Sequence, residues 1–247
     1  MKISSAFPVS PFARLACLLG ALSAVSACST GSEKSSGASG ASGDFQRDFA
    51  LEGRKLGPTG RNEYFVLEPG FQLELASDDG KLTITVLEET KQIGGVTTRV
   101  VEEREEEDGE LVEVSRNYFA IDEATKDVFY FGEQVDVYDH GKLTGHPGAW
   151  LAGEKGARAG LVAPGAPRVG MRYYQELAPD VAMDRAEVVD LAAKLKTPAG
   201  EFKGCLKTHE STGLDKKESE TKLYAPGIGL IQDEDLLLVR SGTAAKR

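Results

Sequence analysis

The chain has 247 residues, of which 40% are hydrophobic, and it carries 29 basic against 39 acidic side chains, a formal net charge of −10. This acidic balance argues against binding to nucleic acid and against an electrostatic attachment to anionic lipid headgroups. The length is sufficient for one large all-β domain, or two small ones, with a substantial hydrophobic core.

The N-terminal segment has the pattern of a secretory signal. Lys2 and Arg14 are the only charged residues before Cys28, and residues 15–27 are almost entirely apolar or small. A positively charged start followed by a short apolar run is typical of a signal peptide and is too short to cross a membrane as a helix. We therefore predict a signal peptide over residues 1–27.

The end of this segment, Val25-Ser26-Ala27-Cys28, resembles the lipobox of bacterial lipoproteins. The resemblance implies cleavage before Cys28 and acylation of that cysteine, and several acyl chains anchor a protein stably in a membrane. Because Ser29 rather than an aspartate follows the cysteine, the same resemblance implies sorting to the outer membrane of a Gram-negative cell. The alternative is an ordinary signal peptide that contains a cysteine at this position by chance.

Residues 28–61 are expected to be the lipidated cysteine and a flexible tether. Ser29 to Gly43 contains ten Ser or Gly among its fifteen residues, so it cannot bury enough surface to become ordered, and its reach is roughly 20 Å. Without Lys2 and Arg14, 27 basic side chains remain against 39 acidic ones, a net charge of −12.

The remaining residues, 62–247, alternate apolar and polar side chains with a period of two. Leu82, Ile84 and Val86 alternate with polar residues, turn sequences such as Asp108-Gly109 separate the runs, and no long stretch has helical periodicity. This pattern predicts an all-β domain, an antiparallel meander that forms a sandwich, a roll or an open barrel.

A weak internal repeat divides this domain into two related halves at an offset of about 100 residues. "PGFQLEL" at Pro69 is similar to "VGMRYYQEL" at Val169, and each is followed by a long strand, a turn and a return strand. We assign the first half to residues 62–138 and the second half to residues 171–247. Residues 139–170, rich in Gly and Pro, are expected to form a long loop between them.

The segments "EETKQIGGVTTRVVEEREEEDGELVEVSRNYFAID", "YYQELAPDVAMDRAEVV" and "KLYAPGIGLI" resemble an uncharacterised family of secreted bacterial β-proteins, over about Asn62 to Val239. That family has no assigned activity, so the resemblance implies a β fold and a secreted address but no site residues. The turns at Asp122 to Asp127 and at Pro179-Asp180 depart from the family's pattern.

The densest group of polar and aromatic residues follows the predicted loop and is the candidate ligand-binding site. Two strands meeting at Pro179 would bring Glu176 and Asp184 together across a hairpin. Paired carboxyl groups beside aromatic rings can bind sugars or perform acid–base catalysis, but a hairpin held by ion pairs of Arg185 is the simpler interpretation. The candidate residues are Trp150, Tyr173, Tyr174, Glu176, Asp184, Arg185 and Glu187.

Other polar groups give weaker indications. The acidic run Glu102–Glu110 lacks the spacing of a calcium loop, so a solvated hairpin end explains it better than a cation site. The three histidines do not have zinc-ligand spacing, and we expect neither a metal nor a cofactor. Cys205 lies between two lysines in a predicted strand, which would favour a thiolate if it were exposed, but a half-buried thiol is preferred.

The sequence therefore predicts a lipid-anchored envelope protein with a non-enzymatic binding or structural role. A carrier of lipids or other apolar ligands on a curved sheet is the alternative, and a carboxylate-dependent glycan hydrolase is a weaker one. The expected partners are the membrane, through the anchor, and a glycan, a lipid or an envelope protein, but not nucleic acid.

Overall fold

The computed structural model describes residues 44–215 and 217–244, so the predicted signal peptide, Cys28 and Ser29–Gly43 lie outside the described residues. The described part contains eighteen strands and no helix, so it offers no helix that could cross a membrane. The strands are β1 (Leu56–Gly57), β2 (Gly60–Asn62), β3 (Phe65–Leu67), β4 (Phe71–Ala76), β5 (Gly80–Ile93), β6 (Val96–Glu107), β7 (Glu110–Asp122), β8 (Val128–Asp139), β9 (Lys142–Gly145), β10 (Trp150–Leu151), β11 (Arg158–Ala163), β12 (Arg172–Tyr174), β13 (Glu176–Leu177), β14 (Asp184–Thr197), β15 (Gly200–Thr212), β16 (Ser219–Ala225), β17 (Gly229–Asp233) and β18 (Leu236–Thr243).

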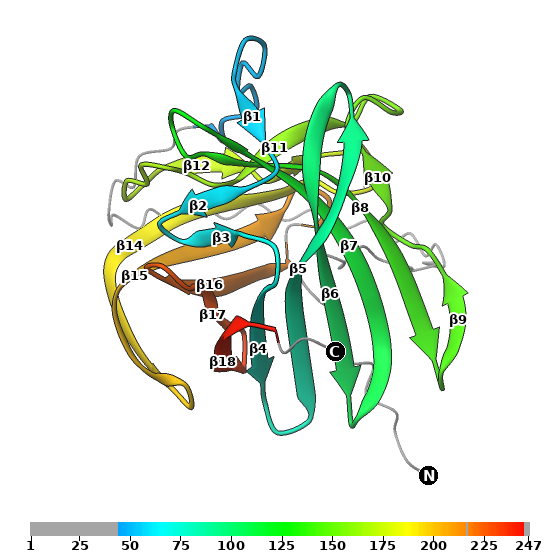
Figure 1. Cartoon of the computed structure of the whole chain (residues 1–247), viewed down its shortest axis with the longest axis vertical. Coiled ribbons are helices and arrows are strands. Elements are labelled where there is room, and N and C mark those ends of the chain that lie inside the picture. Colours follow the sequence, from blue (N-terminus) through cyan, green and yellow to red (C-terminus); the bar gives the residue numbers. More distant parts are fainter. Residues whose placement is uncertain (1–43, 216, 245–247) are drawn as a thin grey trace, which may run out of the picture.

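Most of these strands form one antiparallel sheet that curls into a nearly closed barrel (Figure 1). The order is β12-β14-β15-β16-β17-β18-β4-β5-β6-β7-β8-β11-β13, and the predicted all-β antiparallel fold is thereby confirmed. The two strands at the ends of this order, β12 and β13, are separated in the chain only by Gln175. Tyr173 lies opposite Ala186 of β14, whereas Glu176 lies opposite Ala159 of β11. One short segment therefore joins both edges of the sheet.

The junction between β11 and residues 172–177, which we call the seam, depends on a close approach between two backbones. A Cβ atom placed on Gly160 of β11 would lie 2.3 Å from the carbonyl oxygen of Gln175, far inside van der Waals contact. Glycine at position 160 lets β11 approach the segment between β12 and β13 closely enough to pair with it.

The two halves of the sequence repeat are two meanders that begin in the same way. Gly70 has a φ of 83° and donates its N–H to the carbonyl of Val86, and Gly170 has a φ of 84° and donates to the carbonyl of Val188. The left-handed φ explains the glycine at the start of both copies. The halves lie side by side in the sheet, because β18 pairs with β4 and places Leu237 opposite Ala76.

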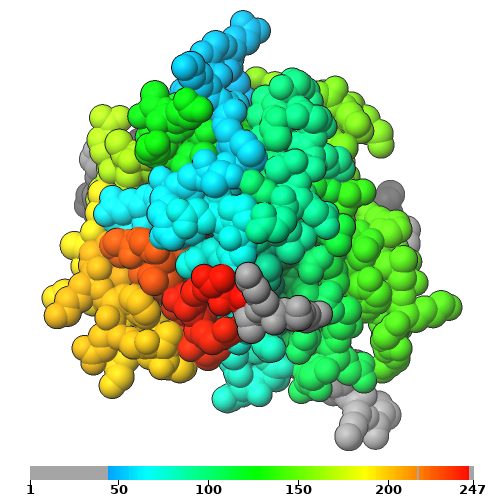
Figure 2. Space-filling view, viewed as in Figure 1, coloured from blue at the N-terminus to red at the C-terminus, as the bar shows by residue number. Residues whose placement is uncertain are grey.

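Residues 44–61, which belong to the predicted tether, pack against the barrel. Phe49 is buried and packs against the ring of Phe129, and Gln46 makes a parallel bridge to Tyr173 at the edge of β12. Strands β2 and β3 form a separate two-stranded sheet. In Figure 2 these strands lie in cyan across one face, between the yellow and orange strands of the second half and the green strands of the first.

The Gly- and Pro-rich segment 139–170 is less irregular than we expected. It contains three strands, β9, β10 and β11, all of which pair with β8. Its glycines and prolines lie mainly in the turns that connect these strands, which is why composition alone suggested a long loop.

The interior of the barrel is divided between an apolar region and a polar one. The apolar region contains buried residues of the neighbouring strands β5, β4, β18 and β17, such as Leu82, Leu75, Leu238 and Ile231. The polar region is lined by the inward-facing positions of β6, β7, β8 and β13–β17, and most of its side chains are acidic.

Candidate functional site

Eight different strands of the described part of the chain each direct a carboxyl side chain into the interior of the barrel. We call these side chains the inner carboxylates: Glu103, Glu113, Glu133, Glu176, Asp184, Glu210, Glu220 and Asp233. Strand alternation explains this arrangement, since residues two apart lie on the same face and paired residues on adjacent strands point the same way. Glu103 lies opposite Ser115, and Glu210 lies opposite both Ala186 and Glu220.

Lys222 of β16 is the buried lysine at the centre of this group. Its Nζ lies 3.6 Å from Glu210 Oε2, 3.5 Å from Glu220 Oε1 and 3.7 Å from Asp233 Oδ2, and its side chain is 1% exposed. Burial alone would lower the pKa of Lys222, but Asp233, Glu220 and Glu210 raise it above its ordinary value. The lysine is therefore charged and balances part of the negative charge of the interior.

Three inner carboxylates lie further from this cation. The Oε2 atoms of Glu103, Glu113 and Glu133 have no hydrogen-bond partner among the described residues. Burial raises the pKa of Glu103 to about 8 and that of Glu113 to about 9, and it raises the pKa of Glu133 well above its usual range. Glu103 and Glu113 are therefore neutral acids at pH 7, because the free-energy cost of burying an uncompensated charge exceeds the cost of binding a proton.

Glu176 and Asp184 form the carboxyl pair that the hairpin pattern suggested. The two side chains are hydrogen-bonded to each other, and the Trp150 indole N–H donates to Glu176 Oε2 at 3.0 Å. The backbone explains the proximity, because the N–H of Gln175 donates to the carbonyl of Asp184 at 2.7 Å.

The environments of these two carboxyl groups differ. Burial and the neighbouring carboxylates raise the pKa of Glu176 well above its usual range, whereas burial raises the pKa of Asp184 only to about 6. A hydrogen bond with Thr212 opposes the shift at Asp184. A proton shared by the pair therefore resides mainly on Glu176, the group with the more strongly raised pKa.

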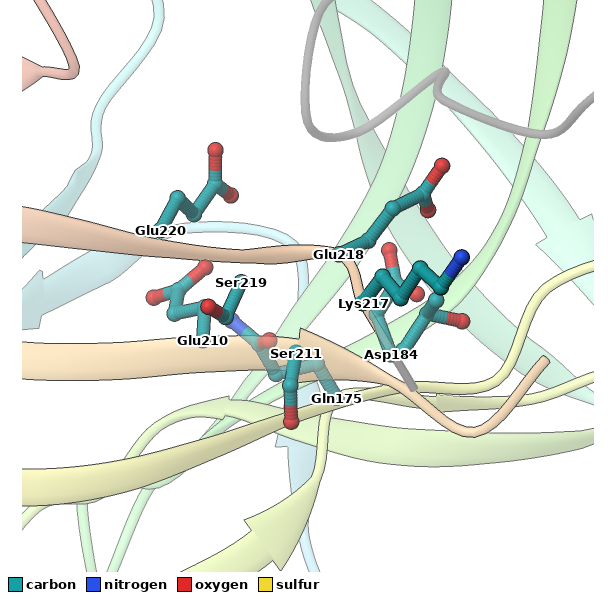
Figure 3. Close-up of a pocket in the computed structure, with 9 residues that line it drawn as sticks. Gln175, Asp184, Glu210, Ser211, Lys217, Glu218, Ser219 and Glu220 are labelled. Atoms are coloured by element: carbon teal, nitrogen blue, oxygen red, sulfur yellow. The ribbon is translucent and has the colours of Figure 1, made fainter. Parts of the chain in front are cut away.

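A cavity of about 230 Å³ reaches this pair from outside, and we call it the acidic pocket. Its walls come from the ends of β14, β15 and β16 and from the segment just before β16 (Figure 3). The lining residues are Gln175, Asp184, Glu210, Ser211, Thr212, Lys217, Glu218, Ser219 and Glu220. Asp184 is half-buried in this wall, while Glu176 lies behind it at 2% exposure.

Charge and hydrogen bonding differ around the walls of the acidic pocket. Glu210 accepts hydrogen bonds at Oε1 from Thr208 Oγ1 (2.8 Å) and from the Tyr224 hydroxyl (3.1 Å). Burial raises the pKa of Glu220 to about 8, against the opposing effect of Lys222. Gln175 is only 4% exposed, and its side-chain amide has no hydrogen-bond partner among the described residues. The acidic pocket thus contains carboxyl groups that accept hydrogen bonds and an amide that makes no hydrogen bond to another described residue.

The structure separates the other predicted site residues. Tyr173 is buried inside the barrel, where burial and Glu210 raise its pKa. The side chains of Tyr174, Arg185 and Glu187 lie instead on the outer face. Tyr174 and Arg185 pack there against the ring of Phe45.

Arg185 does not hold the hairpin by pairing with a carboxylate. Its Nε donates to Ser211 Oγ at 3.1 Å, and Glu187 pairs with Arg172 at 2.7 Å. Alternation explains the division, since neighbouring residues in a strand point to opposite faces.

Most of the inner carboxylates and Lys222 were missed by sequence reasoning. Glu103 belongs to the acidic run that we interpreted as a solvated hairpin end, yet it is 3% exposed. A signal was present, because Glu103 continues the inward face of Val101, and Asp233 continues that of Ile231. A charged residue in phase with apolar residues of the same strand is the pattern that identifies this interior.

The remaining candidates do not form a site in the described part of the chain. No group of three or more His, Cys, Asp or Glu side chains there is arranged to hold a metal ion. Cys205 is a free cysteine with no exposure, and burial raises the pKa of its thiol, so the reactive alternative is not favoured.

The chain matches no protein-family model, no curated protein and no solved structure.

Proposed function

We propose that this chain is a lipid-anchored envelope protein with a non-enzymatic binding role, and that the acidic pocket holds a small polar ligand. The observation that carries the proposal is the pocket itself, a cavity of about 230 Å³ with converging polar groups and the unpartnered amide of Gln175. The Gln175 side chain lines the cavity, so a polar ligand can form a hydrogen bond with its amide.

The cellular location in this proposal rests on the sequence. The lipobox at Cys28 and the Ser/Gly-rich tether after it support anchoring by acyl chains, and the outer membrane of a Gram-negative cell is the proposed location. In such an arrangement the barrel would be held near the membrane by the tether, with the acidic pocket free to exchange small solutes.

The lining of the interior favours a polar ligand over the alternative of a lipid carrier. A carrier of acyl chains needs a continuous apolar lumen, whereas the polar part of this interior holds the inner carboxylates, which come from eight strands. An apolar cavity lies between β3, β4, β5 and β17, but its volume is about 50 Å³, far below the roughly 300–1,000 Å³ of typical ligand pockets.

The hydrolase alternative receives limited support from the Glu176–Asp184 pair. Glycosidases hold their two carboxyl groups about 5–9.5 Å apart, with the scissile bond between them. Here the two groups are hydrogen-bonded to each other, and Glu176 is shielded by Trp150. This geometry leaves no room for a glycosidic bond between the carboxyl groups, so binding is the better interpretation.

A thermal-shift screen of small sugars, amines, amino acids and polyols against the purified domain tests the proposal. We expect at least one compound to raise the Tm, and a pocket-blocking variant, Ser219→Trp, to weaken its binding at least tenfold. Lys142→Trp, at an exposed position of β9, is the matched control and should bind normally. The proposal fails if no small solute binds, or if Ser219→Trp binds as tightly as the parent. Turnover of a glycan, ester or peptide that is lost in Glu176→Gln would overturn the non-enzymatic role.

A further inference from the structure

We infer that the ligand of the acidic pocket is a small organic cation, whose ammonium groups are bound by Asp184, Glu210 and Glu220. This inference rests on the proposed function and narrows it from polar ligands in general to one charge class. Three observations support it: the acidic side chains of the pocket walls, the pairing of Lys222 with three carboxyl groups, and the absence of aromatic and large apolar side chains from the lining.

The walls of the acidic pocket carry an excess of acidic groups. Four of the nine lining residues are Asp or Glu, against one cation, Lys217, which lies at the exposed rim beside Glu218. The lysine behind the wall does not neutralise them, because Lys222 is shared by three carboxylates within 3.5–3.7 Å, one of which, Asp233, does not line the pocket. An additional cation would therefore enter a region of negative potential.

The amide of Gln175 is an independent sign that the acidic pocket is built for a ligand. Gln175 is only 4% exposed, and its side chain lines the cavity. The amide makes no hydrogen bond to another described residue. The amide oxygen can accept a hydrogen bond from an ammonium group, which is a donor with three N–H bonds and no acceptor. Gln175 and the three carboxylates thus present four acceptors to one cavity.

The lining disfavours other ligand classes. The described residues offer no arrangement for a metal ion, so the cation is expected to be organic. The lining residues include no aromatic and no large apolar side chain, which argues against a sugar stacked on a ring and against an acyl chain. Of the predicted partners, the glycan and the lipid are therefore less compatible with this cavity than an amine.

Binding of a cation should be coupled to proton release. The pKa of Asp184 is raised to about 6 and that of Glu220 to about 8, so Glu220 is largely protonated at pH 7. A cation favours the ionised form of both groups, so its affinity should rise as the pH increases from 5 to 9. The charged and titratable groups that face these two carboxyl groups are Glu176, Glu210, Lys217, Glu218, Lys222, Asp233 and Glu234.

Isothermal titration calorimetry with three probes of equal length separates the charge classes. The probes are 1,4-diaminobutane, which is dicationic, 1,4-butanediol, which is neutral, and succinate, which is dianionic. We expect 1,4-diaminobutane to bind at least tenfold more tightly than butanediol at pH 8, and succinate not to bind. Its affinity should fall at least tenfold between pH 8 and pH 5, and binding at pH 7 should release protons to the buffer.

Substitutions locate the binding site. Asp184→Asn and Glu220→Gln should each weaken binding of 1,4-diaminobutane at least tenfold, and Glu218→Gln, at the exposed rim, about threefold. Glu218→Gln cannot disturb the buried network, so it keeps the test valid if a buried variant misfolds. Glu201→Gln, which removes an exposed carboxylate at the far end of the β14–β15 hairpin, is the matched control and should change nothing.

The outcomes separate this inference from the proposed function. Butanediol or a sugar that binds as tightly as the diamine, and is lost in Ser219→Trp, would overturn the cation inference but leave the binding role intact. Diamine binding that Asp184→Asn, Glu220→Gln and Glu218→Gln leave unchanged would reflect the overall acidic charge and would also overturn it. Failure of every solute to bind would overturn both.

Discussion

The indole N–H of Trp150 donates to Glu176 Oε2 across 3.0 Å and so connects β10, on the segment after β9, to the seam that closes the barrel. Both residues are almost fully buried, and Glu176 is also hydrogen-bonded to Asp184 in the wall of the acidic pocket. The only tryptophan of the chain therefore acts on the pocket through one intermediate carboxyl group.

Removal of the indole donor should destabilise the seam. Trp150→Phe leaves Glu176 Oε2 without its N–H donor in a buried position, and we expect a loss of about 1–3 kcal/mol in the free energy of unfolding. Urea denaturation followed by far-ultraviolet circular dichroism measures it, since the variant has no tryptophan to report by fluorescence. A variant as stable as the parent would show that the hydrogen bond contributes nothing.

The neutral inner carboxylates should make the protein more stable in mild acid than in mild base. The pKa of Glu103 is raised to about 8 and that of Glu113 to about 9, so the folded state binds more protons than the unfolded state above about pH 4.5. Stability must then fall as the pH rises through this range. We expect the Tm to drop by at least about 5 °C between pH 5 and pH 9.

A substitution identifies the source of this dependence. Glu113→Gln keeps the shape and the neutral charge of the buried acid but cannot ionise, so the fall in Tm at alkaline pH should be smaller. Glu110→Gln, at an exposed position of the same strand, is the matched control and should retain the full dependence. A Tm that rises from pH 5 to pH 9 would contradict the neutral state of these groups.

The buried lysine should be essential to the polar interior. Lys222→Met leaves Glu210, Glu220 and Asp233 without the cation that lies within 3.7 Å of each of them. Removal of one partner from a buried ion pair costs about 3–5 kcal/mol, and we expect a loss of this size at pH 7. Chemical denaturation measures it, with the exposed Lys142→Met as control. A loss under about 1 kcal/mol would mean that the carboxylates are not held by this charge.

The seam between β11 and β12–β13 should not tolerate any side chain at position 160. Gly160→Ala places a Cβ 2.3 Å from the Gln175 carbonyl oxygen, so the strands must separate, and we expect a loss of at least about 2 kcal/mol in stability. Gly57→Ala, where a Cβ meets nothing within 4 Å, is the matched control for the change in backbone entropy. Equal stability of the two variants would show that the seam can relax.

The proposed lipidation at Cys28 and the membrane location can be tested independently of the barrel. Cys28→Ala should abolish metabolic labelling with a fatty-acid analogue in a bacterial host and release the protein from the membrane fraction, while the spectrum of the purified domain stays unchanged. Ser29→Asp should keep the label and alter the distribution between membranes. A protein that is still acylated in Cys28→Ala would contradict the lipobox interpretation.

The fold was predictable from sequence where a local pattern determines it. Period-two alternation in residues such as Leu82, Ile84 and Val86 indicated strands, and the glycines at 70 and 170 marked the start of the two related halves. The proximity of Glu176 and Asp184 followed from a turn centred near Pro179. Each of these features depends on residues close to one another in the chain.

The rest of the candidate site depends on strand neighbours that are remote in sequence. Glu103 and Asp233 face the same interior only because β18 pairs with β4, and no local pattern indicates that pairing. The pocket likewise needs the register of β14, β15 and β16, which places Glu210 opposite Glu220. Sequence reasoning also placed Tyr174 and Arg185 in one site with Glu176, although alternation sends them to the outer face.

The pairing of β18 with β4 has a consequence for the order of folding. Leu237 and Ala76 are neighbours in the sheet, so one long edge of the first meander lacks its partner until almost the whole chain is present. Such non-local closure is slow, and an unpaired strand edge invites association with other chains. A chain that is synthesised from its N-terminus has to keep the edge of β4 from pairing elsewhere until the last strand is present, so chaperone dependence during folding is to be expected of this topology.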